Sequence, residues 1–208
     1  MPFCVGLDLG QSADYTALAV VQEGEGGELR LRHLERYRLH TPYPEQADAV
    51  AALMRSERLV VEHRDSWDPT PRREFPELVV DATGVGRAVT DLLKTKGLKF
   101  RAVTITGGAS VNAVAGGYHV PKRDLVAALE VPFHTGALKV AEGLELWPAL
   151  RKELLAFRRK INLKTSHDSY EHWRDSDHDD LVLAVALACW WARRKGRDLR
   201  PIPKPRGL

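Results

Sequence analysis

The feature that most constrains this chain is a pair of adjacent aspartates, Asp179 and Asp180, directly before an unbroken apolar run from Leu181 to Ala192. A run of this kind predicts a buried helix. It is too short to span a bilayer, which takes about 20 apolar residues. Two like charges at the start of a buried helix are costly unless something neutralises them. An ordinary role for them is the first turn of the helix, where carboxylates complement the helix dipole.

The rest of the chain shows strand patterns first and then alternating helices and strands. Apolar segments over 3–10 and 15–22 and the alternating segment 28–39 predict three consecutive antiparallel strands. We therefore expect one α/β domain over residues 1–195, a mixed sheet of three antiparallel strands followed by parallel strands, with helices on both faces. Residues 196–208 are basic and proline-rich, which predicts a flexible tail.

Four stretches do not fit simple strands or helices. Residues 61–77 are polar and proline-rich, so we expect a loop or a ragged insertion there. Residues 107–117 are rich in Gly, Ala and Ser and predict a mobile connection. The helix after residue 121 should end at Pro132, since proline lacks the N–H that a helix uses. Residues 166–174 predict a last hairpin or loop.

Composition excludes some classes of protein without identifying a partner. The 208 residues, 44% of them hydrophobic, suffice for one well-buried domain. The net charge of +3 is too small to indicate a nucleic-acid partner. Cys4 and Cys189 both lie in apolar stretches, which predicts reduced core thiols of an intracellular protein. The N-terminus lacks the pattern of a signal peptide, so we expect a soluble cytoplasmic protein.

Two more acidic residues lie where a purely structural role is hard to assign. Asp8 is inside an apolar strand, where aspartate is disfavoured and costly if buried without a partner. A buried, hydrogen-bonded Asp8 is the alternative. Asp81 ends the apolar strand "LVVD", and strand ends are where open α/β sheets place ligand-binding groups. Asp81 could also cap the helix that begins near Val85.

Together these acidic residues predict a site for divalent cations. Converging carboxylates repel one another and raise each other's pKa unless a cation neutralises them. Mg²⁺ and Mn²⁺ prefer oxygen ligands. Two such ions about 3.5–4 Å apart can activate a water and stabilise the leaving oxygen of a phosphodiester. Bound cations would explain why Asp179 and Asp180 are tolerated.

Three blocks that contain these acids resemble a known family. The blocks "GLDLGQSADYTALAVV", "LVVDATGVGRAVTDLL" and "HDDLVLAVALACW", in this order, resemble the C-terminal nuclease domain of tailed-phage terminase large subunits. That domain has the ribonuclease H-like fold shared with Holliday-junction resolvases and transposases. The resemblance runs from about Phe3 to Ala192. It implies a metal-dependent endonuclease that cuts double-stranded DNA in the bacterial host cytoplasm, with two Mg²⁺ or Mn²⁺ ions as cofactors.

The resemblance also implies roles for the four aspartates. Asp8 would bridge the two ions, Asp81 would hold one of them, and Asp179 and Asp180 would hold the other. The helix aspartates are often paired in the family, and their order of importance stays open.

Further residues are implied with an ordinary alternative beside each. His178 could contact phosphate or a metal, or only cap the helix or face solvent. Asp14 fits the first block of the family, but a turn-forming aspartate is the alternative. The basic stretch 151–164 would hold the DNA backbone, although a solvated helix face also explains it. The residues assigned to DNA contacts are Arg158, Arg159, Lys160 and Lys164.

One part of the family's machinery has no counterpart in this sequence. The GxxxxGK[ST] phosphate loop of a packaging ATPase does not occur. We therefore expect a nuclease domain cut from a larger protein, a split subunit whose motor is a separate protein, or a remnant of a degraded prophage. The implied partners are a packaging ATPase, a small terminase or a portal protein. A resolvase-like nuclease, a non-catalytic DNA-binding module of the same fold, and one lobe of an actin- or sugar-kinase-type ATPase remain alternatives. The last needs two such lobes, and 208 residues hold only one.

Overall fold

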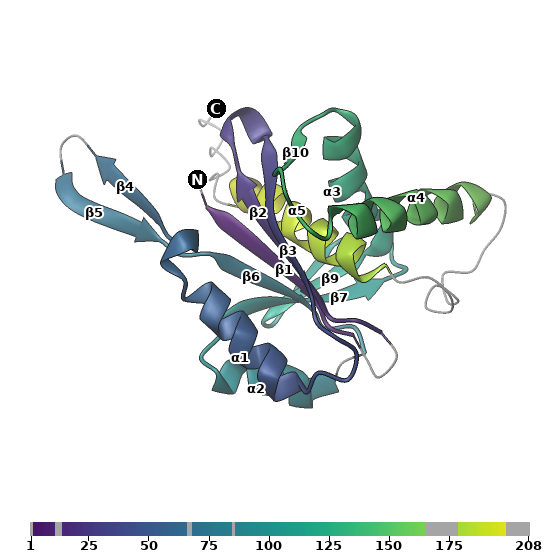
Figure 1. Ribbon diagram of the computed structural model, residues 1–208, viewed down its shortest axis with the longest axis horizontal. Helices are drawn as coiled ribbons and strands as arrows, with labels where there is room; N and C mark the ends of the chain where they lie inside the picture. Colours follow the sequence, from purple (N-terminus) through teal and green to yellow (C-terminus); the bar gives the residue numbers. More distant parts are fainter. Residues whose placement is uncertain (1, 11–13, 66–67, 85, 165–178, 199–208) are drawn as a thin grey trace, which may run out of the picture.

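The computed structural model describes residues 2–10, 14–65, 68–84, 86–164 and 179–198 (Figure 1). The strands are β1 (Phe3–Asp8), β2 (Ala17–Glu23), β3 (Leu29–Arg36), β4 (Val61–Asp65), β5 (Asp68–Glu74), β6 (Glu77–Asp81), β7 (Phe100–Thr106), β8 (Asn112–Val114), β9 (Gly117–Pro121) and β10 (Leu138–Val140). The helices are α1 (Tyr43–Met54), α2 (Gly86–Thr95), α3 (Lys122–His134), α4 (Trp147–Lys164) and α5 (Asp180–Asp198). Short 3₁₀ turns lie at Glu25–Gly27 and Glu57–Leu59.

The central sheet has the strand order β10-β3-β2-β1-β6-β7-β9-β8. Strands β1, β2 and β3 are antiparallel neighbours, whereas β6, β7 and β9 run parallel to β1. The short strand β10 joins the edge parallel to β3, and β8 pairs antiparallel with β9 at the other edge. The mixed sheet with helices on both faces, predicted from the sequence, is confirmed.

Side chains of β1 alternate between two cores, one on each face of the sheet. Val5 and Leu7 belong to the core shared with α1 and α2. Cys4 belongs to the core that contains α5. Gly6 also faces α5, because a Cβ on Gly6 would lie 2.0 Å from the carbonyl oxygen of Ala184. A glycine at this position therefore lets α5 lie directly on β1 (Figure 1).

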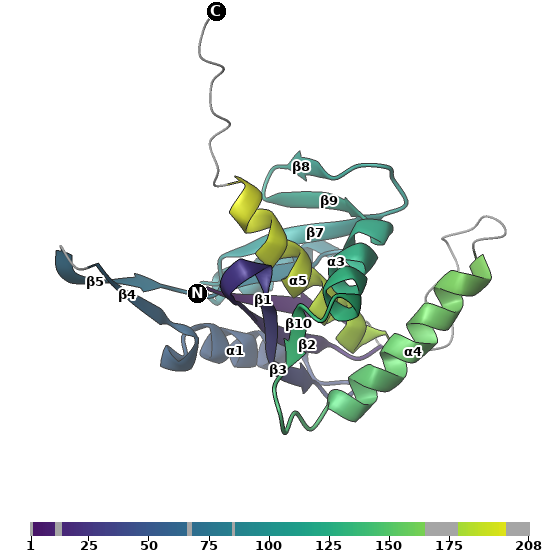
Figure 2. The same cartoon turned by 90° about the horizontal axis from the view of Figure 1, so that it is seen from above.

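The loop expected over 61–77 is wrong, because β4 and β5 form a separate two-stranded sheet there. Val61 pairs with Glu74 and Asp65 with Asp68. Proline is tolerated in a strand with an unpaired edge, where no ladder hydrogen bond is lost. In the described residues β5 pairs only with β4, which accommodates its two prolines. The hairpin extends away from the central sheet in both views (Figures 1 and 2).

Two smaller expectations also need correction. The connection over 107–117 contains the short edge strand β8. Helix α3 does not end at Pro132 but continues for two residues to His134. A proline so close to the C-terminus removes one hydrogen bond, and Pro132 is buried against the domain. Residues 166–174 and most of the expected tail lie outside the described residues, and α5 extends to Asp198.

The expected core cysteines are buried and are not joined in a disulfide. Burial raises the pKa of the Cys189 thiol to about 12, against a smaller lowering by Arg193. Within the described part of the chain, no helix combines the length and apolar character needed to cross a membrane.

Candidate functional site

Asp8 is the last residue of β1 and is 8% exposed. Because Gly6 faces α5, Asp8 two residues later faces α5 as well. Across the β1–β2 pair Asp8 lies opposite Ala17, which is part of the core beneath α5. Asp8 therefore ends its strand on the face of the sheet that α5 covers.

Asp81 is the last residue of β6, the parallel neighbour of β1, and it is also buried. Leu7 pairs with Val80, so the next residues, Asp8 and Asp81, lie level at adjacent strand ends. The Oδ1 atom of Asp81 accepts the Thr83 N–H at 2.7 Å. This bond shapes the turn that leads from β6 toward α2.

Asp180 is the first residue of α5 and is 5% exposed, whereas Asp179 is partly buried. The Asp179 carbonyl accepts the Leu183 N–H at 2.9 Å and so opens the hydrogen bonding of the helix. Ala184, one turn after Asp180, is the residue that contacts Gly6. Helix α5 begins beside the C-terminal end of β1 and runs back along that strand (Figure 1).

A residue that the sequence interpretation missed, Glu153 of α4, holds the start of α5. Its Oε2 atom accepts the N–H groups of Leu181 at 3.1 Å and Val182 at 3.3 Å. Its Oε1 atom accepts a hydrogen bond from the Arg36 guanidinium. The first N–H groups of a helix have no partner within the helix. Glu153, itself 8% exposed, provides that partner from a neighbouring helix.

Arg36, the partner of Glu153, lies in the same row of paired residues across the sheet as Asp8. Arg36 pairs with Ala17 across β3 and β2, and Ala17 pairs with Asp8 across β2 and β1. Asp81 continues the same row on β6. The first turn of α5 is therefore tied to the row that holds Asp8 and Asp81. All four predicted aspartates come to one end of one face of the sheet.

The side chains are not gathered into a formed ligand cluster. Among the residues that the structure describes, no three His, Cys, Asp or Glu side chains lie close enough together to hold a metal ion. The donor set still fits the expected cations, because carboxylate oxygens are the ligands that Mg²⁺ and Mn²⁺ prefer. These donors come from three separate elements, β1, β6 and α5, whose ends the fold brings to the same end of the sheet.

Asp14 lies in the turn between β1 and β2 and is exposed. Its carbonyl oxygen would be 2.2 Å from a Cβ on Gly10, so the turn closes tightly at this point. The Gly10 N–H donates to Thr16 Oγ1 at 3.0 Å across the same turn. This placement suits the turn-forming alternative for Asp14. His178 lies outside the described residues.

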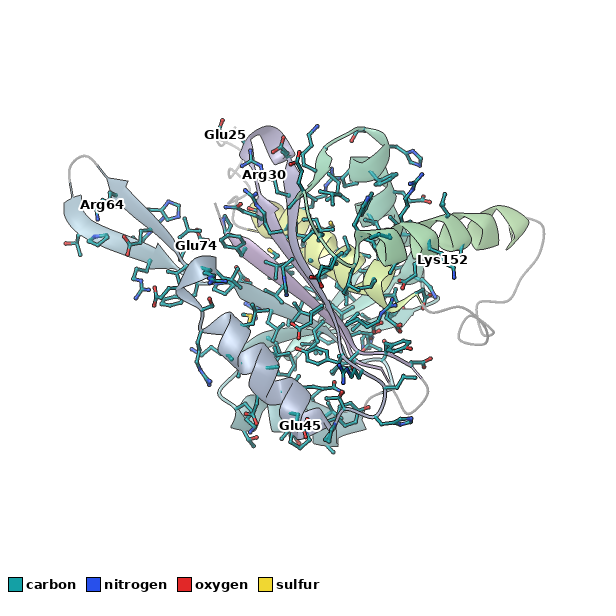
Figure 3. The ribbon with its side chains drawn as sticks, viewed as in Figure 1. Glu25, Arg30, Glu45, Arg64, Glu74 and Lys152 are labelled. Carbon is teal, nitrogen blue, oxygen red and sulfur yellow. The ribbon has the colours of Figure 1, made fainter. Side chains whose placement is uncertain are left out.

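The residues assigned to DNA contacts belong to the second half of α4, and their side chains lie outside the described part of the structure. Helix α4 extends outward from the body of the domain in both views (Figures 1 and 2). Arg151 and Lys152, earlier in the same helix, are exposed, and Lys152 projects from it (Figure 3).

No protein-family model matches this sequence, and no curated protein matches it. Among solved structures, the chain is similar to the large terminase nuclease from thermophilic phage G20c. The two are 20% identical, the alignment covers 90% of this chain and 80% of that one, and the TM-score is 0.54. The chain is also similar to the human cytomegalovirus terminase nuclease domain, Mn soaked, with 14% identity, 90% and 81% coverage, and a TM-score of 0.50. At these identities the likeness concerns the fold. The chain therefore has the ribonuclease H-like fold of the terminase nuclease domains.

Proposed function

We propose that this protein is a divalent-metal-dependent DNA endonuclease that acts in phage genome packaging. The observation that carries the proposal is the level placement of Asp8 and Asp81 at adjacent strand ends, with Asp179 and Asp180 at the start of the helix tied to that row. Three of these four residues are buried, and carboxylate oxygens are the ligands that Mg²⁺ and Mn²⁺ prefer. The fold shared with terminase nucleases supports the same activity.

Two Mg²⁺ or Mn²⁺ ions are the proposed cofactors. Asp8 would contribute oxygens to both, Asp81 to one, and Asp179 and Asp180 to the other. When bound, such ions lower the pKa of a water and stabilise the oxygen that leaves a phosphodiester. The cytomegalovirus domain was soaked with manganese, which supports testing Mn²⁺ first.

We propose that the sheet and α5 hold these carboxylates at fixed positions relative to one another. Asp8 and Asp81 end strands that are hydrogen-bonded to each other, so their backbones are set by the sheet. Sites on strands and helices are held more accurately than sites on loops.

DNA is proposed to bind along α4. Arg151 and Lys152 are exposed on this helix, and the further basic residues 158–160 and 164 continue it. Phosphate contacts release counterions, so the affinity for DNA should fall steeply with salt concentration. The proposed partners in packaging are a packaging ATPase, a small terminase or a portal protein, which the likeness to a large terminase nuclease supports.

The test is nicking of supercoiled plasmid in Mg²⁺ or Mn²⁺. Asp81→Asn keeps the shape of the side chain, removes its charge and should abolish nicking. EDTA should stop the wild-type reaction. Asp91→Asn, at an exposed position on α2, is the matched control and should cut like the wild type. Undiminished metal-dependent nicking by Asp81→Asn would remove Asp81 from the site.

A further inference from the structure

We propose that Glu153 and Arg36 are a positioning pair for the candidate active site. Glu153 fixes the first turn of α5, and with it Asp179 and Asp180, relative to the row that contains Asp8. Neither residue of the pair contacts the reacting atoms. This inference rests on the proposed metal-dependent nuclease function.

The Glu153 carboxylate contacts α5 through one oxygen atom and Arg36 of β3 through the other. Oε2 accepts two consecutive N–H groups of α5, at 3.1 Å and 3.3 Å. Oε1 accepts from Arg36, which is level with Asp8 in the sheet. Helix starts are commonly capped by a residue of their own chain segment. A cap from α4 instead ties the start of α5 to a different part of the fold.

Arg36 is itself held in place by its neighbours. Its side chain is 19% exposed and its guanidinium lies 5.1 Å from the ring centroid of Tyr15. Arg36 ends β3, and Tyr15 immediately precedes Thr16, whose carbonyl accepts the Tyr37 N–H at 2.9 Å. The sheet is therefore linked to the first turn of α5 through a part-buried Arg36–Glu153 contact and the buried hydrogen bonds from Leu181 and Val182 to Glu153.

The Arg36–Glu153 pair also limits the negative charge at the start of α5. A buried carboxylate at the start of α5, where Asp179 and Asp180 lie, would add to their mutual repulsion. Arg36 neutralises Glu153, so the pair places the helix without adding net charge to the site. A buried ion pair is weak evidence for stability, whereas a role in fixing geometry is a reason to retain one. Thermal unfolding measures a role in stability, and Mn²⁺ affinity measures a role in the geometry of the site.

The experiment compares Glu153→Ala, Glu153→Gln and a matched control. Glu28→Ala breaks the Arg30–Glu28 pair at the opposite end of β3, and Figure 3 shows Arg30 there, away from α4. Mn²⁺ affinity is measured by electron paramagnetic resonance, and hydrogen exchange is measured at the Leu181 and Val182 amides. Thermal unfolding and the Mg²⁺ concentration for half-maximal nicking are recorded in parallel.

We expect Glu153→Ala to weaken Mn²⁺ binding by roughly 10–100-fold, the range seen when supporting residues of metal sites are lost. The Leu181 and Val182 amides should exchange faster. Glu153→Gln should recover only part of the affinity, since its amide oxygen still accepts the two N–H groups but its NH₂ group cannot accept from Arg36. Glu28→Ala should leave Mn²⁺ affinity unchanged.

Unchanged Mn²⁺ affinity in folded Glu153→Ala would overturn the proposal, as would an equal loss in Glu28→Ala. If Glu153→Ala does not fold, Arg36→Lys takes its place: it keeps the charge but changes the geometry, and an unchanged affinity would again overturn the proposal. If the wild type binds no Mn²⁺ and Asp8→Asn behaves identically, the nuclease function itself fails and the positioning role falls with it.

Discussion

The two faces of the central sheet are both buried but differ in the polar groups that they bury. In the described residues, the buried acidic side chains are those of Asp8, Asp81, Glu153 and Asp180. All four lie on the side of α4 and α5. On the other face, beneath α1, the buried polar residue Gln46 is neutral, and its amide donates to the Thr41 carbonyl at 2.7 Å.

This difference separates what the protein needs for folding from what it needs for chemistry. The α1–α2 face is packed with aliphatic side chains such as Leu18 and Leu78, which stabilise the fold by leaving water. Buried carboxylates oppose folding unless they are paired or bind a cation. The proposed cation site lies at the end of the α5 face where these carboxylates are concentrated.

The largest expected effect comes from Asp8→Asn on the α5 face. The substitution keeps the side-chain volume and removes one of the crowded charges. Nicking should fall by more than the roughly 10–100-fold that supporting residues of a metal site provide. The unfolding midpoint in EDTA should not fall, and Mn²⁺ should raise it in the wild type only. Plasmid nicking and calorimetry check this; a substantial loss of stability in EDTA would mean that Asp8 serves the fold.

On the opposite face, Leu93→Ala should have the reverse profile. Leu93 of α2 is 1% exposed in the core with Leu78 and Val80. Its truncation should lower the free energy of unfolding by about 2–5 kcal/mol. The metal dependence of nicking by the folded fraction should stay unchanged. Urea unfolding and an Mg²⁺ titration of activity measure both quantities. A large change in metal requirement would show that the two faces are not separable.

Gly6→Ala should affect both stability and activity, since Gly6 is where α5 touches the sheet. A Cβ would lie 2.0 Å from the Ala184 carbonyl oxygen, so α5 must move. Overpacking of this kind should cost about 1–3 kcal/mol of unfolding free energy. Because Asp180 moves with the helix, Mn²⁺ affinity should also drop. A drop in stability alone would argue that the first turn of α5 is not part of the site.

The smallest effect is expected from charge reversal on α4. Arg158→Glu combined with Lys160→Glu should weaken DNA binding and flatten its dependence on salt concentration, because fewer counterions are released. Mn²⁺ affinity should remain that of the wild type. Lys99→Glu, before β7 at the other end of the sheet, is the control. Fluorescence anisotropy at several salt concentrations gives the slopes; identical slopes would exclude α4 from the DNA contact.

The sequence was sufficient to predict the fold class and to single out four aspartates on three elements of that fold. Apolar periodicity identified β1, β6 and α5, and Asp8 and Asp81 stood out against aliphatic neighbours; Asp8 was expected inside its strand but is the last residue of β1. Asp8 and Asp81 are distant in sequence but lie at the same end of the sheet, because β1 and β6 are parallel neighbours and parallel strands have their C-terminal ends at the same end. The fold class could be predicted because strands and helices follow from local sequence patterns, and because only a few ways of connecting them are allowed.

Other features could not be found in this way. The hairpin β4–β5 is polar and contains prolines, so its pattern matched a loop. Glu153 received no role from the sequence, because it lies within the basic stretch 151–164, although it adjoins Leu154 and lies one turn from Leu150 on an apolar stripe of the helix. An acid beside that stripe was the available signal. Its partners Arg36 and Leu181 are distant in sequence, and only the tertiary structure brings them together.

The central claim is that the carboxylates on the α5 face form a divalent-cation site. A titration with Mn²⁺, followed by electron paramagnetic resonance, tests it on the wild type, Asp8→Asn and the exposed control Asp91→Asn. We predict saturable binding in the wild type and the control, and loss of that binding in Asp8→Asn. Absence of saturable binding in the wild type, or equal binding in all three proteins, would contradict the claim.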